Sequence, residues 1–304
     1  MQYGIMKRMF RYLIFQCVFI FVSLLCVAQE ATLNIWDGTD CNATVKLTPY
    51  LAKGEKNMAI VICPGGSYFW IDKKTEGKGV AEWLQSNGIS AFVLEYRVGG
   101  VAAFVTHYRL ISRGNRYPDM LQDVQRCIQI IRENAIDYGV DPDKVGVMGF
   151  SAGGHLAIMS GLFYDNDVLA LLGIHPKVSL KPDYLASIYP VVSLTDRSTH
   201  KRSRRGLLGE GMSISNEMKD SLSLERHVRK DMPPTFLVNC VDDHVVKYRN
   251  SELLDSAMNI HGVVHKYIQY QTGGHGFGAS PEKTTSEAIE WKNEFLKWLK
   301  GIMK

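Results

Sequence analysis

A chain of 304 residues, 46% apolar and 22% charged, is long enough for one globular domain with a sizeable core. Its formal net charge is +4, and three of the positive charges, Lys7, Arg8 and Arg11, stand near the N-terminus. Without them the chain is nearly neutral, which gives no support for a nucleic-acid partner.

The N-terminal segment has the pattern of a secretory signal peptide. The basic residues are followed by an apolar run over residues 12–28 and then by a polar junction. We expect cleavage after Ala28, so that residues 1–28 are a signal peptide and residues 29–304 are a secreted or periplasmic domain without stable membrane association. The alternative is a retained membrane anchor, but the run is somewhat short for a bilayer span of about 20 residues.

The segments after residue 28 alternate between strand and helix patterns. The expected strands cover residues 32–36, 43–47, 58–63, 89–96, 145–150, 185–192, 235–241 and 264–270. The expected helices cover residues 76–86, 118–138, the stretch from His155, and residues 250–260 and 284–300. This alternation predicts an α/β fold with a mostly parallel sheet, helices on both faces and the first two strands at an antiparallel edge.

Two connections break this alternation. The segment 99–116 carries glycines at one end and Arg113-Gly114-Asn115-Arg116 at the other, and segment 193–230 is polar. A connection of the length of segment 99–116 is usually functional or mobile.

The stretch Val145–His155 is typical of a nucleophile elbow. An apolar strand ends at Ser151, glycines flank the serine in a G-x-S-x-G pattern, and a helical pattern follows. Side chains at Gly149 and Gly153 would collide with the neighbouring strand and helix as the turn tightens. We predict Ser151 as a nucleophile, and the alternative is a structural serine in a tight turn.

Acid and base candidates follow two later predicted strands. Asp242 and Asp243 come directly after residues 235–241, and His275 lies between glycines after the last strand. Ligand sites gather at the carboxyl ends of parallel strands, and the order Ser, Asp, His is that of α/β hydrolases. We predict His275 as general base and Asp243 as the acid that orients it, with Asp242 structuring the turn. By contrast, we expect His155 to be a packed residue of the helix that follows Ser151.

The oxyanion of an acyl-transfer reaction needs backbone N–H donors. Ala152 supplies one at the elbow, and the loop after residues 58–63 offers Gly66 and Ser67, although this loop could also be a plain glycine turn. Tyr68 and Trp70, with the aromatic residue between them, could line a wall for a sugar or aryl group. Packing explains these aromatic residues about as well.

Together these motifs resemble secreted α/β-hydrolase-fold esterases, close to the bacterial acetyl xylan and feruloyl esterase-like enzymes. The matching pieces are Cys63-Pro64-Gly65-Gly66-Ser67-Tyr68, Leu94-Glu95-Tyr96-Arg97, Pro118-Asp119-Met120-Leu121-Gln122-Asp123, residues 141–156 and Gly274-His275-Gly276-Phe277. The resemblance implies an α/β-hydrolase catalytic domain over residues 29–304 with a small cap or insert region. It also implies a serine carboxylesterase that forms an acyl-enzyme, needs no metal or cofactor, and removes acetyl or feruloyl groups from hemicellulose.

The chain departs from the family pattern at three positions. Pro64 stands where related esterases carry histidine, Ser67 replaces a third glycine, and Lys247 replaces a proline after the acid. The segment 199–209 resembles the family's cap region, and its basic run is either a solvated face or a site that attracts uronic-acid groups.

Two other functions stay open at this point. One is an exopeptidase of the same fold, and the other is a noncatalytic protein that binds carbohydrate. Four cysteines remain after the predicted cleavage, and none has zinc spacing. Because Cys63 and Cys240 lie in apolar strands and Cys127 in a helical pattern, we expect buried free thiols rather than a disulfide framework.

Overall fold

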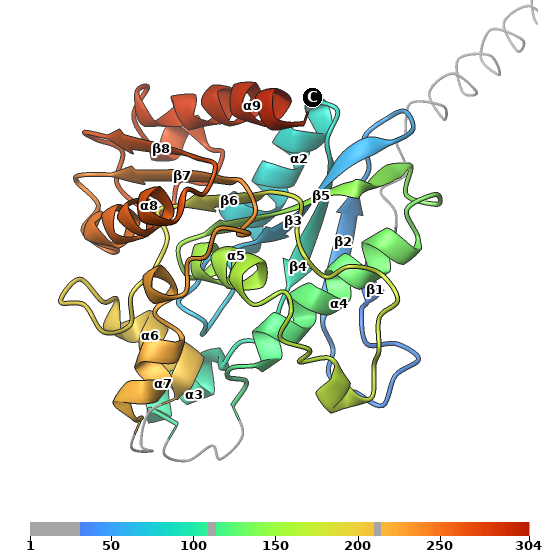
Figure 1. The fold of residues 1–304 in the computed structure, drawn as a ribbon, viewed down its shortest axis with the longest axis horizontal. Helices are drawn as coiled ribbons and strands as arrows, with labels where there is room; N and C mark the ends of the chain where they lie inside the picture. Colours follow the sequence, from blue (N-terminus) through green and yellow to red (C-terminus); the bar gives the residue numbers. More distant parts are fainter. Residues whose placement is uncertain (1–30, 109–113, 210–213, 304) are drawn as a thin grey trace, which may run out of the picture. The chain divides into compact units, whose positions relative to one another are not determined.

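The computed structural model describes residues 31–108, 114–209 and 214–303, so the predicted signal peptide lies outside the described residues. An eight-stranded sheet runs through them in the order β1-β2-β4-β3-β5-β6-β7-β8 (Figure 1). The strands are β1 (Leu33–Asn34), β2 (Lys46–Tyr50), β3 (Asn57–Cys63), β4 (Ser90–Glu95), β5 (Val140–Phe150), β6 (Leu185–Ile188), β7 (Thr235–Cys240) and β8 (His265–Tyr270). The β1–β2 and β2–β4 pairs are antiparallel and the others parallel, which confirms the predicted mostly parallel sheet with an antiparallel edge.

Helices cover both faces of this sheet. Those that pack against it are α2 (Gly79–Ser86), α4 (Asp119–Glu133), α5 (Ala152–Leu162), α8 (Arg249–His261) and α9 (Trp291–Ile302). In Figure 1, α2 and α9 lie on one side of the strands and α4, α5 and α8 on the other. Because side chains alternate along a strand, Val61 joins the core under α4 and α5, while Ile60 joins the core under α2 and α9. The predicted α/β-hydrolase architecture is therefore confirmed.

Several predicted boundaries were wrong. The helix expected over 118–138 ends at Glu133, because Asn134 starts a series of turns that closes at Gly139 with φ +60°. The helix expected over 284–300 is α9, which begins only at Trp291 after two short 3₁₀ turns.

The two irregular connections contain short helices of their own. Helix α3 (Gly100–Thr106) lies in the first, and α6 (Lys201–Leu208) and α7 (Asn216–Ser221) lie in the second. The Tyr108 hydroxyl donates to the Gly206 carbonyl oxygen at 3.0 Å, which joins the two segments although they are far apart in sequence. We call the described residues 99–108, 114–116 and 193–209 the cap.

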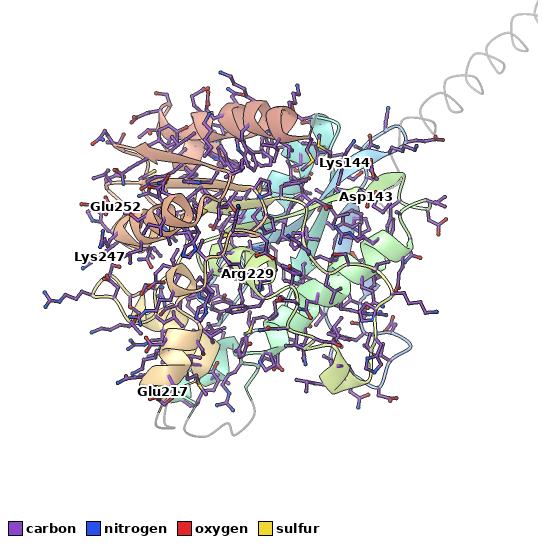
Figure 2. The ribbon with its side chains drawn as sticks, viewed as in Figure 1. Asp143, Lys144, Glu217, Arg229, Lys247 and Glu252 are labelled. Atoms are coloured by element: carbon purple, nitrogen blue, oxygen red, sulfur yellow. The ribbon has the colours of Figure 1, made fainter. Side chains whose placement is uncertain are left out.

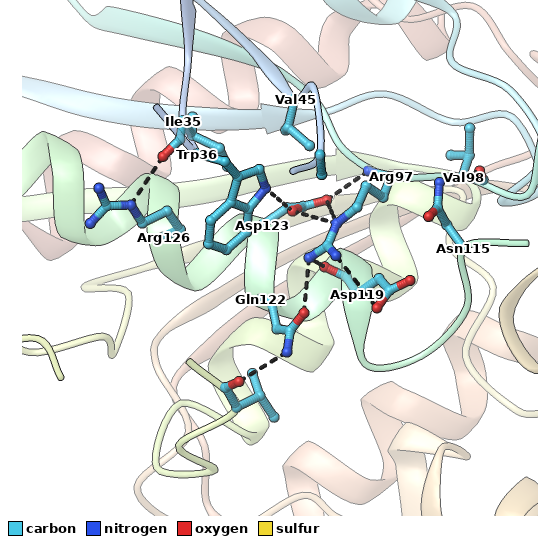
Figure 3. A network of polar contacts seen from close by, with 12 residues as sticks. Ile35, Trp36, Val45, Arg97, Val98, Asn115, Asp119, Gln122, Asp123 and Arg126 are labelled. Carbon is cyan, nitrogen blue, oxygen red and sulfur yellow. Dashed lines mark hydrogen bonds and ion pairs between the residues drawn. The ribbon is translucent and has the colours of Figure 1, made fainter. Parts of the chain in front are cut away.

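A buried ion pair ties the end of β4 to helix α4 (Figure 3). The Asp123 carboxylate accepts hydrogen bonds from the Arg97 backbone N–H at 2.7 Å, the Arg97 side chain at 2.9 Å and the Trp36 indole N–H at 2.9 Å. Arg97 also donates to Gln122 Oε1 at 2.9 Å. Burial raises the pKa of Asp123 to about 6, even though Arg97 opposes this shift. The network fixes the point where the chain leaves the sheet for the cap.

We expect Asp123→Ala to lower the free energy of unfolding by about 3–5 kcal/mol, because the largely buried Arg97 charge would lose its fully buried carboxylate partner. The matched control is Asp119→Ala. Asp119 pairs with the same guanidinium at 3.5 Å but is partly exposed, so its loss should cost less than about 1 kcal/mol. Urea titrations of both variants measure the difference, and equal losses would contradict this account.

His155 is a packed helix residue, as predicted. Its ring is fully buried in α5, with Nδ1 2.9 Å from the Tyr68 hydroxyl and Nε2 2.9 Å from the Leu222 carbonyl oxygen. A carbonyl only accepts, so Nε2 carries the proton of the neutral ring and Nδ1 accepts from Tyr68. Burial lowers the pKa of His155 from 6.5 to about 4.

This burial predicts a pH dependence of stability. The unfolded chain takes up a proton below pH 6.5 while folded His155 stays neutral down to about 4, so its contribution is present above 6.5 and is lost as pH falls toward 4. We expect His155→Gln to flatten the fall in unfolding free energy between about pH 7 and about pH 5. The exposed His244→Gln is the control, and an unchanged slope in His155→Gln would contradict the assignment.

Candidate active site

Ser151 occupies a strained turn between β5 and α5. Its backbone has φ 54° and ψ −118°, a conformation that non-glycine residues rarely adopt. A Cβ on Gly149 would lie 1.9 Å from the Gly153 carbonyl oxygen, and one on Gly153 would lie 2.0 Å from the Cys63 carbonyl oxygen. The two glycines are therefore required by close backbone approach, for the reason that the sequence motif suggested.

The loops after β7 and β8 bring two polar side chains to this serine. His275 Nε2 lies 2.9 Å from Ser151 Oγ, and His275 Nδ1 lies 2.6 Å from Asp243 Oδ2. Asp243 Oδ1 accepts from the backbone N–H groups of Val245 at 2.8 Å and Val246 at 2.9 Å, which fixes the carboxylate. Serine, imidazole and carboxylate thus form one hydrogen-bonded chain, in which the imidazole can take the serine proton and the carboxylate can stabilise the resulting cation.

The two adjacent aspartates have different partners. Asp242 accepts from the backbone N–H groups of Gly273 at 3.1 Å and Gly274 at 2.9 Å, whereas Asp243 reaches the imidazole. Asp242 therefore holds the loop that carries His275.

Lys247, which replaces the proline of the family pattern, is exposed at the periphery (Figure 2).

The glycine loop after β3 lies directly against the serine. A Cβ on Gly65 would lie 2.9 Å from Ser151 Cβ, so only a glycine allows this approach. In the described part of the chain, the backbone N–H groups of Gly66, Ser67 and Ala152 donate to no protein acceptor. These are the three donors that the sequence proposed for an oxyanion, and Ala152 adds the positive end of helix α5.

The predicted aromatic wall is only partly present. Trp70 is 39% exposed, but Tyr68 is 1% exposed and its hydroxyl bonds to His155. The prediction that the Tyr68 side chain binds substrate is therefore wrong, because the ring packs into the core instead of facing solvent. Trp70 stays a candidate binding residue.

Arg202 is a site residue that sequence reasoning did not single out. From α6 in the cap, its Nε donates to Ser67 Oγ at 3.1 Å, and its guanidinium lies 5.5 Å from the centroid of the Trp70 ring. The basic run at 201–205 was the available signal, but it did not indicate which residue turns inward. Nearby, burial and the charge of Arg202 lower the pKa of His200 to about 4.

The described residues contain no cluster of three or more His, Cys, Asp or Glu side chains that could hold a metal ion. In the same residues, no helix is long and apolar enough to cross a bilayer. Cys63, Cys127 and Cys240 are buried free thiols, as expected.

Comparison with known proteins gives relatives over most of the chain. It is 28% identical over 253 residues to an acetylxylan esterase of Xylanibacter ruminicola, covering 83% of this chain and 46% of the relative. It is 30% identical over 250 residues to endo-1,4-beta-xylanase B of Butyrivibrio fibrisolvens, covering 80% of this chain and 37% of the relative. The chain thus spans less than half the length of these two curated relatives.

A solved structure matches nearly end to end. The acetyl ester-xyloside bifunctional hydrolase of Caldicellulosiruptor lactoaceticus superposes with a TM-score of 0.77 at 30% identity, covering 92% of this chain and 98% of that one. The sequence model of the BD-FAE family matches residues 48–258, which include Ser151 and Asp243. With the strand order and the elbow described above, these matches establish that the chain belongs to the BD-FAE family and has the α/β-hydrolase fold.

Proposed function

We propose that this protein is a serine carboxylesterase that hydrolyses acyl esters, acetyl or feruloyl, on hemicellulose. The observation that carries the proposal is the hydrogen-bonded chain from Ser151 Oγ through the His275 ring to Asp243. Its setting on a strained turn beside unoccupied N–H donors is what acyl transfer requires. The names of the relatives, an acetylxylan esterase and an acetyl ester-xyloside hydrolase, favour an ester linked to a plant polysaccharide.

In the proposed mechanism, Ser151 Oγ attacks the ester carbonyl carbon while His275 Nε2 takes the hydroxyl proton. Asp243 stabilises the imidazolium, and the N–H groups of Gly66, Ser67 and Ala152 stabilise the oxyanion. The imidazolium then protonates the departing sugar oxygen, which leaves an acyl group on Ser151. Water, deprotonated by His275, hydrolyses this acyl-enzyme and frees the acid.

The substrate would approach past the cap. Trp70 is exposed there and could stack on a sugar or aryl ring, and Arg202 lies against its face. The predicted signal peptide supports a secreted or periplasmic enzyme acting on this polymer outside the cytoplasm.

We expect Ser151→Ala to lower kcat for p-nitrophenyl acetate by at least about 10⁴-fold, because the nucleophile is removed. The matched control is Ser160→Ala, which removes a hydroxyl in the same helix that donates to the Ala157 carbonyl oxygen. Acetate and ferulate released from xylan by the wild-type protein would then identify the acyl group. Peptide cleavage without ester cleavage would indicate an exopeptidase, and carbohydrate binding without any turnover would indicate a binding protein.

The two aspartates should differ in kinetics. Asp243→Asn should lower kcat by about 10⁴-fold, since an amide cannot support the imidazolium or the required tautomer. Asp242→Asn keeps one acceptor oxygen for the two N–H groups of the glycine loop. It should therefore lower kcat by at most about tenfold, the equivalent of one lost hydrogen bond. The same steady-state ester assay measures both, and the reverse order would assign the acid to Asp242.

A further inference from the structure

A buried carboxylate that the proposed mechanism does not use lies beneath the site. Glu76, in the π-helical turn η1 (Lys73–Lys78), is 3% exposed. In the described residues no Lys or Arg side chain pairs with it. A buried carboxylate without a cationic partner costs several kcal/mol unless hydrogen bonds compensate, so such a group usually serves a purpose beyond stability.

The two oxygens of Glu76 reach two different loops of the site. Oε2 accepts from the backbone N–H of Gly65 at 2.6 Å, and Oε1 accepts from the Tyr189 hydroxyl at 2.8 Å. The same hydroxyl accepts from the backbone N–H of Gly278 at 2.9 Å. One chain of three hydrogen bonds thus runs from the glycine loop to the loop that carries His275.

At the glycine-loop end, this chain fixes the peptide group that precedes the oxyanion donors. Gly65 lies against Ser151, and its N–H is held by Glu76 while its carbonyl oxygen accepts from Asp72 N–H at 3.0 Å. The Gly66 carbonyl oxygen accepts from Phe69 N–H at 3.0 Å. The peptide groups before and after Gly65 are thus held by Glu76 and by Asp72 N–H. The second of these groups carries the Gly66 N–H, which is therefore held in one direction.

At the other end, Tyr189 supports the imidazole. Its ring centroid lies 4.5 Å from that of His275 and 4.7 Å from that of Phe277. Tyr189 has φ +40°, a strained value for a tyrosine, directly after strand β6. This strained backbone conformation places the Tyr189 ring against the His275 ring. Burial raises the pKa of Glu76, and the hydrogen bond from Tyr189 and then the electrostatic interaction with His275 oppose this rise.

We propose that Glu76 and Tyr189 form a buried bridge that positions the oxyanion loop and the His275 loop relative to each other. Glu76 is then a positioning residue for the transition state and touches no reacting atom itself. This inference rests on the proposed esterase function and adds a residue pair to its machinery.

The test is Glu76→Gln in the full chain. A glutamine has one acceptor oxygen instead of two. If that oxygen keeps the Gly65 N–H, an amide N–H group faces the Tyr189 hydroxyl, and the hydroxyl proton loses its acceptor. We expect kcat for p-nitrophenyl acetate to fall by about 10-fold to 100-fold, with KM within about threefold. The thermal midpoint should stay close to that of the wild-type protein, because the loss of one buried hydrogen bond and the smaller cost of burying an amide instead of a carboxylate oppose each other.

Tyr189→Phe provides a second variant, because it removes the hydroxyl and keeps the ring. We expect a similar loss of kcat, and the double variant should lose no more than the larger single loss, since both act in one chain. Glu82→Gln is the matched control. This glutamate is exposed on α2 and should leave kcat unchanged.

The outcomes separate this inference from the proposed function. If the wild-type protein hydrolyses the ester and Glu76→Gln matches its kcat, the bridge has no positioning role, although the esterase proposal stands. If the loss of kcat is accompanied by a lowered thermal midpoint, or if both variants fail to fold, the bridge has a purely structural role. If the wild-type protein has no esterase activity, both proposals fail.

Discussion

The site depends on a steric constraint at the carboxyl end of the central strand. Three backbone segments meet there at distances that allow no side chain: the β5–α5 turn, the first turn of α5 and the loop after β3. The contacts at Gly65, Gly149 and Gly153 would bring any Cβ within 2.9 Å of a neighbouring atom. This packing holds Ser151 in its strained conformation, and the other polar groups are arranged around a hydroxyl placed in that way.

The elements behind the hydroxyl are buried. All residues of α5 are buried, between the sheet and the segment around Leu222 and Leu224, and the strands beside it are fully covered. A helix that is buried on every side is held by its whole surface, so its N-terminus has little freedom to move. The glycine and histidine loops are therefore attached to a fixed support, which favours accurate positioning of the reacting groups.

Two buried carboxylates illustrate different uses of the same chemical group. Asp123 has a guanidinium partner and joins β4 to α4, away from Ser151. Glu76 has only uncharged donors and connects two loops that border Ser151. The first arrangement is expected of a structural ion pair. The second places a buried carboxyl group without a cationic partner close to an imidazole that gains a proton during the proposed reaction.

The cap adds side chains to a site that otherwise lies at the carboxyl ends of the strands. Its helix α6 places Arg202 against Ser67 and Trp70, so a cationic group and an aromatic surface lie beside the glycine loop. Ser67, which replaces a glycine of the family pattern, gives Arg202 its hydrogen-bond acceptor. The departure from the pattern and the cap residue are thus parts of one contact.

Local pattern was enough to predict the alternating strands and helices, the antiparallel edge, the elbow at Ser151 and the loops that carry Asp243 and His275. These features depend on short-range periodicity and on glycines whose conformations are set by their neighbours in sequence. Only the tertiary structure decided the separate partners of Asp242 and Asp243, the burial of Tyr68, the inward turn of Arg202 and the bridge from Glu76 to Tyr189. Those contacts join residues as much as 135 positions apart, as in the Arg202–Ser67 pair, so no local signal distinguishes them from ordinary surface or core positions.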